Sequence, residues 1–246
     1  GDHLVLLAKN IKGYRNLIKL VSLAWIKGFY YTPRIDKEML AQHREGLIAS
    51  SACLAGEIPD EILNGTMAGA EAALKGYLDI FGKDFYLEMQ RHETFDPDSD
   101  TSVFPLQQKV IESLRKLAEK FDVKLIATND IHFINAEDAE AHDRLICINT
   151  AKDIDDPDRL RYTKQEYLKS EEEMRSLFSD IPEAVDNVGE LVAKIEKYKL
   201  DHEPIMPDFE LPPGYTDKDD YLRYLTYEGA AERWGELNDD IKERID

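Results

Sequence analysis

The chain has 246 residues, of which 43% are hydrophobic and 33% are charged, and its formal net charge at pH 7 is −19. This length suffices for one large domain, or for one domain and the start of another. The negative charge argues against a nucleic-acid-binding surface formed by this chain alone, because such surfaces need clustered Lys and Arg. No apolar run approaches membrane-spanning length, and two cysteines are too few for a disulfide scaffold, so a reduced, cytoplasmic setting without a membrane partner is expected.

Short apolar runs alternate with helical patterns in the first half of the chain. Buried strands are predicted at Leu4–Ala8, Gly46–Ser51, Phe85–Gln90 and Lys124–Thr128. This alternation predicts an α/β fold with a parallel sheet or barrel. The predicted helices are a segment with Leu17, Leu20, Val21 and Ala24, a short helix capped by Asp36 that ends near Gln42, Glu57–Leu63, Met67–Phe81, and a long helix marked by Leu106, Val110, Leu114, Leu117 and Phe121.

The second half is mostly helical. We expect residues 1–200 to form one domain, followed by an extended linker, rich in proline, at His202–Gly214 and the beginning of another region in 201–246. Asp180 is the expected N-cap of the helix that contains Pro182 in its first turn. The helices predicted here are Ala136–Ile148, Ser170–Phe178, Pro182–Ile195 and Lys218–Trp234.

Four potential metal ligands follow three of the predicted strands. Cys53 comes after the second strand, His92 after the third, and Asp130 and His132 after the fourth. In a parallel barrel the carboxyl ends of the strands open onto one face, so these side chains are expected to converge. Thiolate, imidazole and carboxylate are ligands for zinc, and the last two also suit manganese or iron. A metal there would support phosphoester hydrolysis.

Each of these residues also has an ordinary structural interpretation. Cys53 can be a small core residue, His92 an ordinary surface histidine, and Asp130 the cap of a turn. The other histidines have no companions in the sequence and are taken as surface or structural residues: His3, His43, His142 and His202. Cys147 is interpreted as a core residue on the apolar face of a helix, with Leu145 and Ile148 near it.

Taken in order, several stretches resemble the family of bacterial replicative DNA polymerase III alpha subunits, in the polymerase and histidinol phosphatase (PHP) domain and the entry into the palm. The resemblance covers nearly the whole chain. The matching stretches are LLAKNIKGYRNLIKLVS near the start, SSACLAGEIP, FYLEMQRH, ATNDIHFI, AEAHDRLICINT, DDPDRLRYTKQEYLKSEEEM and FSDIPEAVDN.

This resemblance implies a partial, distorted β/α barrel in 1–200, followed by a mostly helical segment whose last part, 201–246, begins the palm. It implies that Cys53, His92, Asp130 and His132 bind a divalent metal (zinc, manganese or magnesium) at a 3′–5′ exonuclease or phosphoesterase type of site. The parent would be a DNA-directed DNA polymerase, a nucleotidyltransferase. Its expected partners are DNA, a proofreading exonuclease subunit and a sliding clamp.

The chain departs from the family pattern, since the His-x-His motif of the first barrel strand and the polymerase catalytic aspartates are absent. We therefore expect a chain that begins inside the barrel, binds metal weakly or not at all, and is inactive, and we assign no catalytic residue. An open barrel edge should pair with another copy or lie under a helix. Two alternatives remain: a structural PHP scaffold with a degenerate site that binds a proofreading partner, and a free-standing metal-dependent phosphoesterase.

Overall fold

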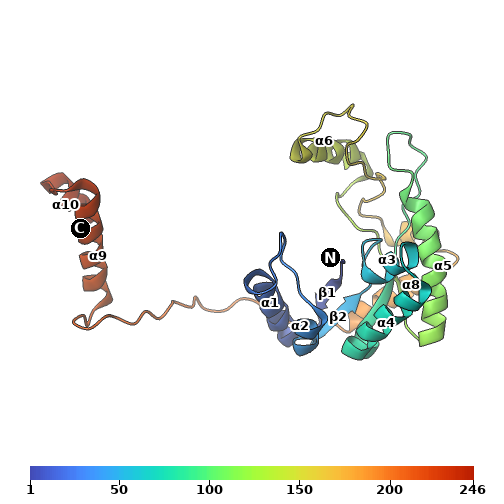
Figure 1. Cartoon of the computed structure of the whole chain (residues 1–246), viewed down its shortest axis with the longest axis horizontal. Helices are drawn as coiled ribbons and strands as arrows, with labels where there is room; N and C mark the ends of the chain where they lie inside the picture. Colours follow the sequence, from blue (N-terminus) through green and yellow to red (C-terminus); the bar gives the residue numbers. More distant parts are fainter. The chain divides into compact units, whose positions relative to one another are not determined.

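A four-stranded sheet with the strand order β1-β2-β3-β4 is the centre of residues 1–198. The computed structural model describes all 246 residues, and the N-terminal strands of the sheet are labelled in Figure 1. Three neighbouring strands are parallel, as predicted, and the mixed α/β fold class is confirmed. The strands are β1 (Val5–Ala8), β2 (Leu47–Ser50), β3 (Phe85–Met89) and β4 (Leu125–Ala127).

The first strand does not follow the parallel prediction, because β1 pairs antiparallel with β2. Two glycines account for this direction. Helix α1 (Ile11–Ile26) begins directly after β1, and its Gly13 touches Gly46, the residue before β2. The backbone N–H of Lys9 also donates to the Gly46 carbonyl at 2.8 Å. Strand β2 therefore starts where β1 ends, and the two must run in opposite directions.

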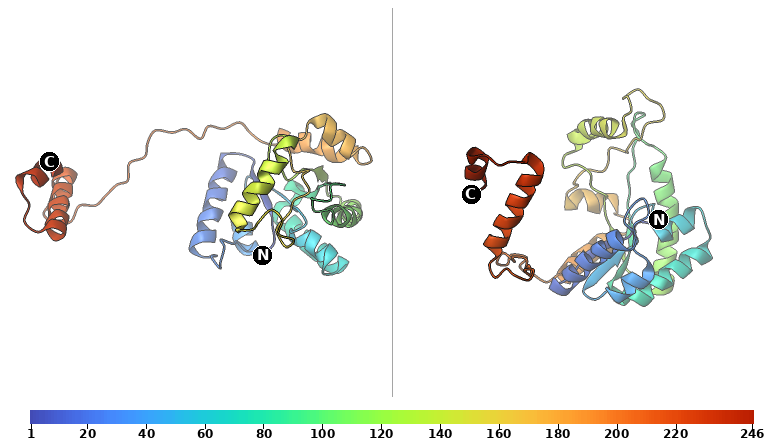
Figure 2. Two further views of the ribbon diagram at one scale, coloured as in Figure 1. Left: turned by 90° about the horizontal axis from the view of Figure 1, so that it is seen from above. Right: turned by 60° about the vertical axis from the view of Figure 1, so that its left-hand side comes forward.

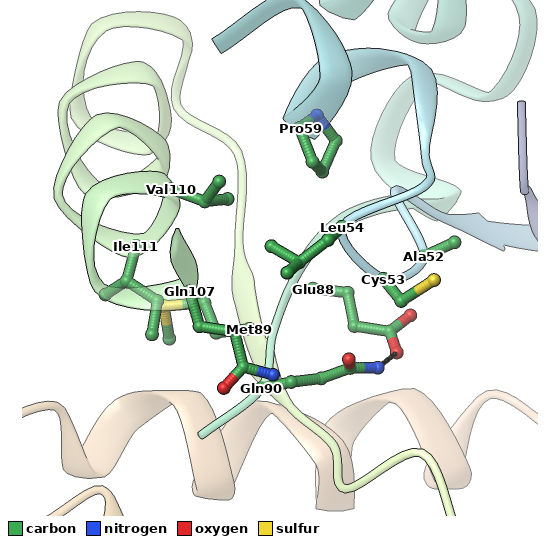
Figure 3. Close-up of a pocket in the computed structure, with 10 residues that line it drawn as sticks. All are labelled: Ala52, Cys53, Leu54, Pro59, Glu88, Met89, Gln90, Gln107, Val110 and Ile111. Carbon is green, nitrogen blue, oxygen red and sulfur yellow. Dashed lines mark hydrogen bonds between the residues drawn. The ribbon is translucent and has the colours of Figure 1, made fainter. Parts of the chain in front are cut away.

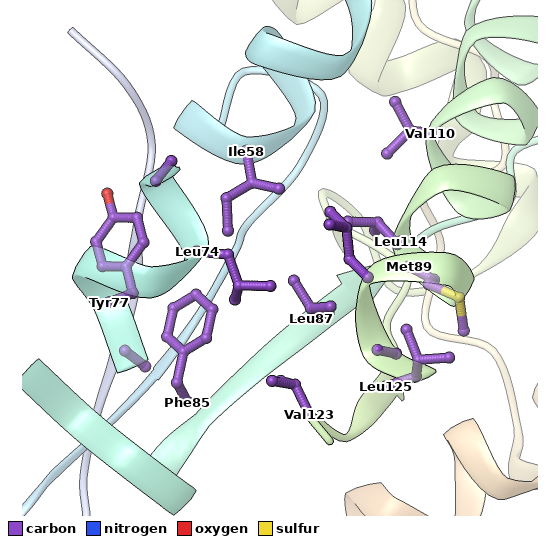
Figure 4. Packing of buried hydrophobic residues seen from close by; sticks show 14 of the residues in the cluster. Ile58, Leu74, Tyr77, Phe85, Leu87, Met89, Val110, Leu114, Val123 and Leu125 are labelled. Carbon is purple, nitrogen blue, oxygen red and sulfur yellow. The ribbon is translucent and has the colours of Figure 1, made fainter. Parts of the chain in front are cut away.

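Helices cover both faces of the sheet. On one face, Phe85, Leu87 and Met89 of β3 pack in a large cluster with residues of α4 and α5, including Leu74 and Leu114 (Figure 4). Tyr86 points to the other face, where Leu191 of α8 packs against it together with Ile48 and Ile126. The whole of β3 is buried for this reason. The helices around the sheet are α2 (Lys37–Gln42), α3 (Glu57–Leu63), α4 (Met67–Phe81), α5 (Val103–Phe121), α7 (Glu171–Leu177) and α8 (Pro182–Ala193).

Two sequence predictions about the second half need correction. The N-cap residue of α8 is Ile181, because the Asp180 carboxylate is engaged elsewhere: both of its oxygens accept from the Arg91 guanidinium, at 2.6 and 2.9 Å. Cys147 of α6 (Ala139–Thr150) is buried as predicted, but its neighbours Leu145 and Ile148 are exposed. They are exposed because α6 stands away from the sheet (Figures 1 and 2).

The segment 199–246 forms a separate unit. It starts with a stretch without regular structure and continues as α9 (Lys218–Trp234), as predicted, and α10 (Asp239–Ile245), which the sequence did not predict. Its assignment to the polymerase palm stays a prediction. None of the helices combines the length and apolar character that a membrane crossing requires.

The edge of the sheet at β1 has no further strand beside it. Just beyond β1, the Lys9 carbonyl accepts a hydrogen bond from the backbone N–H of Glu196 at 2.8 Å, so the chain after α8 lies against this corner. Val5 and Leu7 of β1 remain partly exposed. Pairing of this edge with another copy stays a prediction.

Candidate metal site at the strand ends

A buried carboxylate, Glu88 of β3, ties the three parallel strands together near their carboxyl ends. It accepts hydrogen bonds from Ser50 Oγ of β2 at 2.5 Å and from Thr128 Oγ1 after β4 at 2.6 Å. Gln90 Nε2 donates to the same carboxylate at 3.2 Å (Figure 3). The backbone N–H of Glu88 in turn donates to Ser51 Oγ at 2.8 Å. These bonds hold the strand ends, and hence the residues that follow them, in one fixed arrangement.

The chain turns sharply after two of these strands. Ala52, after β2, has a φ of 60°, and Asp130, after β4, has a φ of 44°. Left-handed backbone costs an L-residue roughly 1–2 kcal/mol, although Asp tolerates it better than Ala does. Strain of this kind is found at functional sites more often than elsewhere. Cys53 directly follows the first of these turns, and His132 lies two residues after Asp130 in the second.

Cys53 has a neighbour that the sequence did not predict. Its Sγ lies 3.5 Å from Nδ1 of His3, two residues before β1, and residues 3 and 56 form an isolated β-bridge. Burial raises the pKa of the Cys53 thiol, and the carboxylates of Asp130 and Glu88 act in the same direction. The thiol therefore stays protonated near neutral pH unless a cation stabilises the thiolate.

Asp130 and His132 form a second pair, as their spacing in the sequence predicts. His132 Nε2 lies 3.7 Å from Asp130 Oδ1, and both side chains are partly exposed. The His132 ring also contacts the rings of Tyr162 and His142, whose centroids lie 4.8 and 5.6 Å away. Burial lowers the pKa of His142, and His132 lowers it further. His142 thus belongs to the group of rings around this pair. The sequence indicates a surface or structural residue at this position and does not predict its contact with His132.

His92 is deeply buried, which rules out the interpretation as a surface histidine. Its ring nitrogens have partners within the protein: Gln107 Nε2 lies 3.1 Å from Nδ1, and the Asn129 carbonyl lies 3.0 Å from Nε2. The Glu166 carboxylate is 3.9 Å from Nδ1. Burial lowers the pKa of His92, although Glu166 opposes this effect. The ring is therefore neutral at pH 7.

The four predicted ligands occupy one end of the sheet but are not gathered into one group. Their donor chemistry (a thiol, two imidazoles and a carboxylate) fits a zinc-type ion. No group of three or more His, Cys, Asp or Glu side chains is arranged to hold a metal ion. The structure instead gives two pairs, Cys53 with His3 and Asp130 with His132, and a separate His92. The metal-ligand set stays a prediction.

Tertiary contacts also place several residues here that sequence reasoning did not select. Glu88 alternates with the apolar residues of β3, which is a signal that was present in the sequence. Gln107 and Glu166 gave no such signal, because they reach His92 from α5 and from the loop before α7. One oxygen of the buried Glu166 carboxylate, Oε2, has no hydrogen-bond partner, and neither does Asn129 Oδ1. Acceptor oxygens of this kind suit a cation or a water molecule.

Lys169, which lies near Glu166, should make the free energy of unfolding change with pH in the alkaline range. Burial lowers its pKa from 10.5 to about 8, although the carboxylates of Glu166 and Glu173 oppose the shift. Between these two pH values the unfolded chain binds a proton that the folded chain does not, so stability rises with pH. We expect the free energy of unfolding of the wild type to rise relative to that of Lys169→Met over this range, in urea titrations at successive pH values. If the difference in free energy of unfolding between the wild type and Lys169→Met stayed flat or fell with rising pH, the burial of the Lys169 side chain would be contradicted.

Comparison with known proteins shows which family this chain resembles. Residues 1–92 match the PHP domain. The chain is 42% identical to the DNA polymerase III subunit alpha of Borreliella burgdorferi over 244 residues, which are 98% of this chain and 20% of that protein. The same subunit of Treponema pallidum is 40% identical (99% of this chain, 20% of that protein), and that of Thermus aquaticus is 41% identical (94% and 19%). The chain thus spans about a fifth of the length of these relatives. It belongs, as a segment that begins with PHP-domain sequence, to the family of DNA polymerase III alpha subunits.

Proposed function

We propose that this chain is the PHP portion of a bacterial replicative DNA polymerase and that its strand-end site binds a divalent metal of the phosphoesterase type. The observation that supports the metal site best is the polar layer centred on Glu88. It fixes three parallel strand ends, and Cys53, Asp130 and His132 follow two of them. Polymerisation, and contacts with DNA, a proofreading exonuclease subunit and a sliding clamp, belong in this proposal to the complete polymerase.

In this proposal Cys53, Asp130 and His132 would hold the metal, and the fourth predicted ligand, His92, is left out because both of its ring nitrogens already have partners within the protein. A bound divalent metal supplies Lewis acidity and lowers the pKa of a coordinated water. The other groups keep the ligands in place: Glu88 fixes the strand ends, and His132 is packed against Tyr162 and His142. The backbone N–H of His132 also donates to the Glu166 carbonyl at 2.8 Å, which ties the loop after β4 to the loop before α7.

A second candidate function is a PHP scaffold whose site is degenerate. The observation in its favour is the absence of any group of three ligands, together with the two partners that occupy the His92 ring. In that case the module would support the polymerase and bind a proofreading partner. A free-standing phosphoesterase is disfavoured, because the similarity to polymerase subunits covers nearly the whole chain.

Metal titration of the purified chain with Zn²⁺ and Mn²⁺ tests these alternatives. We expect weak binding that falls about tenfold or more in Asp130→Asn, a loss of the size that a disturbed metal site shows. Asn keeps the left-handed backbone that position 130 needs, so the fold should survive the change. Isothermal calorimetry and metal analysis would provide the two measurements.

Asp122→Asn is the matched control. Asp122 also has a left-handed backbone, with φ 54°, but it caps the C-terminal end of α5 just before β4, whereas Asp130 and His132 follow the opposite end of that strand. The Asp122→Asn variant should therefore bind metal as strongly as the wild type. No binding by any of the three proteins would favour the scaffold, and tight binding that Asp130→Asn leaves unchanged would refute the proposed ligands. A parallel assay of single-stranded DNA digestion would show whether bound metal supports 3′–5′ exonuclease activity.

A further inference from the structure

The buried His92 ring has a hydrogen-bond partner at every polar atom. Both His92 and Gln107 are about 3% exposed, so water does not compete for these bonds. The Gln107 amide makes two of the contacts: its Oε1 accepts from the His92 backbone N–H at 2.8 Å, and its Nε2 lies 3.1 Å from the ring Nδ1. The ring Nε2 lies 3.0 Å from the Asn129 carbonyl oxygen. One side chain of α5, Gln107, thus hydrogen-bonds both the backbone and the ring of His92.

These contacts determine where the ring hydrogen is. A backbone N–H can only donate, so the oxygen of the Gln107 amide must face it, and the NH₂ group must face Nδ1. Nδ1 must then accept, which leaves the hydrogen on Nε2. A backbone carbonyl can only accept, and the Asn129 carbonyl is what Nε2 meets. The two ends of the network therefore agree on one neutral form of His92, with Nε2–H as the donor.

We propose that Gln107 is a positioning residue that holds His92 as the Nε2–H tautomer and directs this hydrogen to the end of β4. Asn129 continues the network, since its Nδ2 donates to the carbonyls of Gln165 and Tyr167 at 2.9 and 2.7 Å. The network thus links α5, the segment after β3, the segment after β4 and the loop before α7, directly before the Asp130–His132 pair. Its importance for metal binding rests on the proposed function, but the tautomer does not.

Glu166 is the other group that could orient this ring. Its Oε1 is 3.9 Å from Nδ1, beyond hydrogen-bonding distance, and this oxygen already accepts from the Thr163 hydroxyl at 2.6 Å and from the Thr163 N–H at 3.1 Å. Gln107 is nearer and makes two bonds to His92, so it sets the orientation. A carboxylate that controlled the ring would instead require a hydrogen on Nδ1.

Long-range ¹H–¹⁵N NMR of the full chain labelled at histidine distinguishes the two tautomers, and His92→Gln identifies the resonances of His92. We expect the wild type to show a protonated Nε2 and an unprotonated Nδ1. In Gln107→Glu the carboxylate can only accept, so Nδ1 should gain a hydrogen while Nε2 keeps the one that it donates to the Asn129 carbonyl, and both ring nitrogens should be protonated. Gln108→Glu adds the same charge at the next position of α5 and should leave the wild-type pattern unchanged.

Two results would overturn the proposal: an Nδ1–H tautomer in the wild type, or an unchanged pattern in Gln107→Glu. If Gln107→Glu does not fold, the wild-type spectrum alone still decides the first of these. Metal titration of Gln107→Glu separates the proposal from the proposed function. If Nδ1 gains its hydrogen in Gln107→Glu although neither the wild type nor the variant binds metal, the role of Gln107 is supported and only the metal site is refuted.

Discussion

Gly13→Ala is expected to lower the free energy of unfolding by about 3 kcal/mol, the upper part of the usual range for overpacking. A Cβ atom at position 13 would lie 1.8 Å from the carbonyl oxygen of Gly46, so the start of α1 and the residue before β2 would have to move apart. Helix propensity alone predicts the opposite sign, because Ala is about 1 kcal/mol better than Gly inside a helix. Urea unfolding followed by circular dichroism therefore decides between the two effects: a lower free energy of unfolding in the variant indicates the clash, and a higher one indicates helix propensity.

Gly189→Ala is the control for this change. Gly189 lies within α8, and a Cβ there would meet no atom within 4 Å. With no clash to oppose it, helix propensity should stabilise this variant by up to about 1 kcal/mol. If both variants became more stable, the close contact between α1 and the start of β2 would be wrong, and with it the explanation for the antiparallel β1.

The contact between Gly13 and Gly46 also shows where sequence-based prediction reaches its limit. Helices such as α3 and α4 were predicted with their observed bounds, because their caps and apolar spacing are local signals. The direction of β1 depends on two glycines 33 positions apart in the numbering, whose meeting no local pattern reports. The wrong N-cap of α8 has the same origin, since Asp180 is a good capping residue that instead binds Arg91.

The candidate site follows the same rule. Asp130 and His132 are two residues apart on one turn, so their pairing could be predicted from the sequence. The contact of Cys53 with His3 requires β1 to lie beside β2, and the hydrogen bonds between Gln107 and His92 require α5 to pack against the end of β3. Neither contact follows from a local pattern. The alternation in β3 separated Phe85, Leu87 and Met89 from the polar residues correctly. The burial of Glu88 could not be read from it, because the hydroxyl partners come from β2 and from the residue that follows β4.

Glu88→Leu is expected to destabilise the protein by about 3 kcal/mol, since each buried donor left without an acceptor costs about 1–3 kcal/mol. The donors that lose their partner are Ser50 Oγ, Thr128 Oγ1 and Gln90 Nε2. An opposing effect is that Leu removes the cost of burying a carboxylate, and such replacements can be neutral when every partner becomes apolar. Here the three partners stay polar, so the loss should prevail in chemical unfolding experiments.

Glu88→Gln tests whether the acceptor or the charge matters at this position. The Gln side chain keeps Oε1, which can still accept from Thr128 Oγ1 and Gln90 Nε2, and its NH₂ group can donate to the Ser50 hydroxyl, which is able to reverse its role. We therefore expect a loss of about 1 kcal/mol, the net value of a weakened hydrogen bond. Equal losses for Gln and Leu would mean that the negative charge, and not the set of acceptors, holds the three strand ends together. A stable Leu variant would mean that the hydroxyls find other partners, and the polar layer would then no longer explain the fixed position of Cys53, Asp130 and His132.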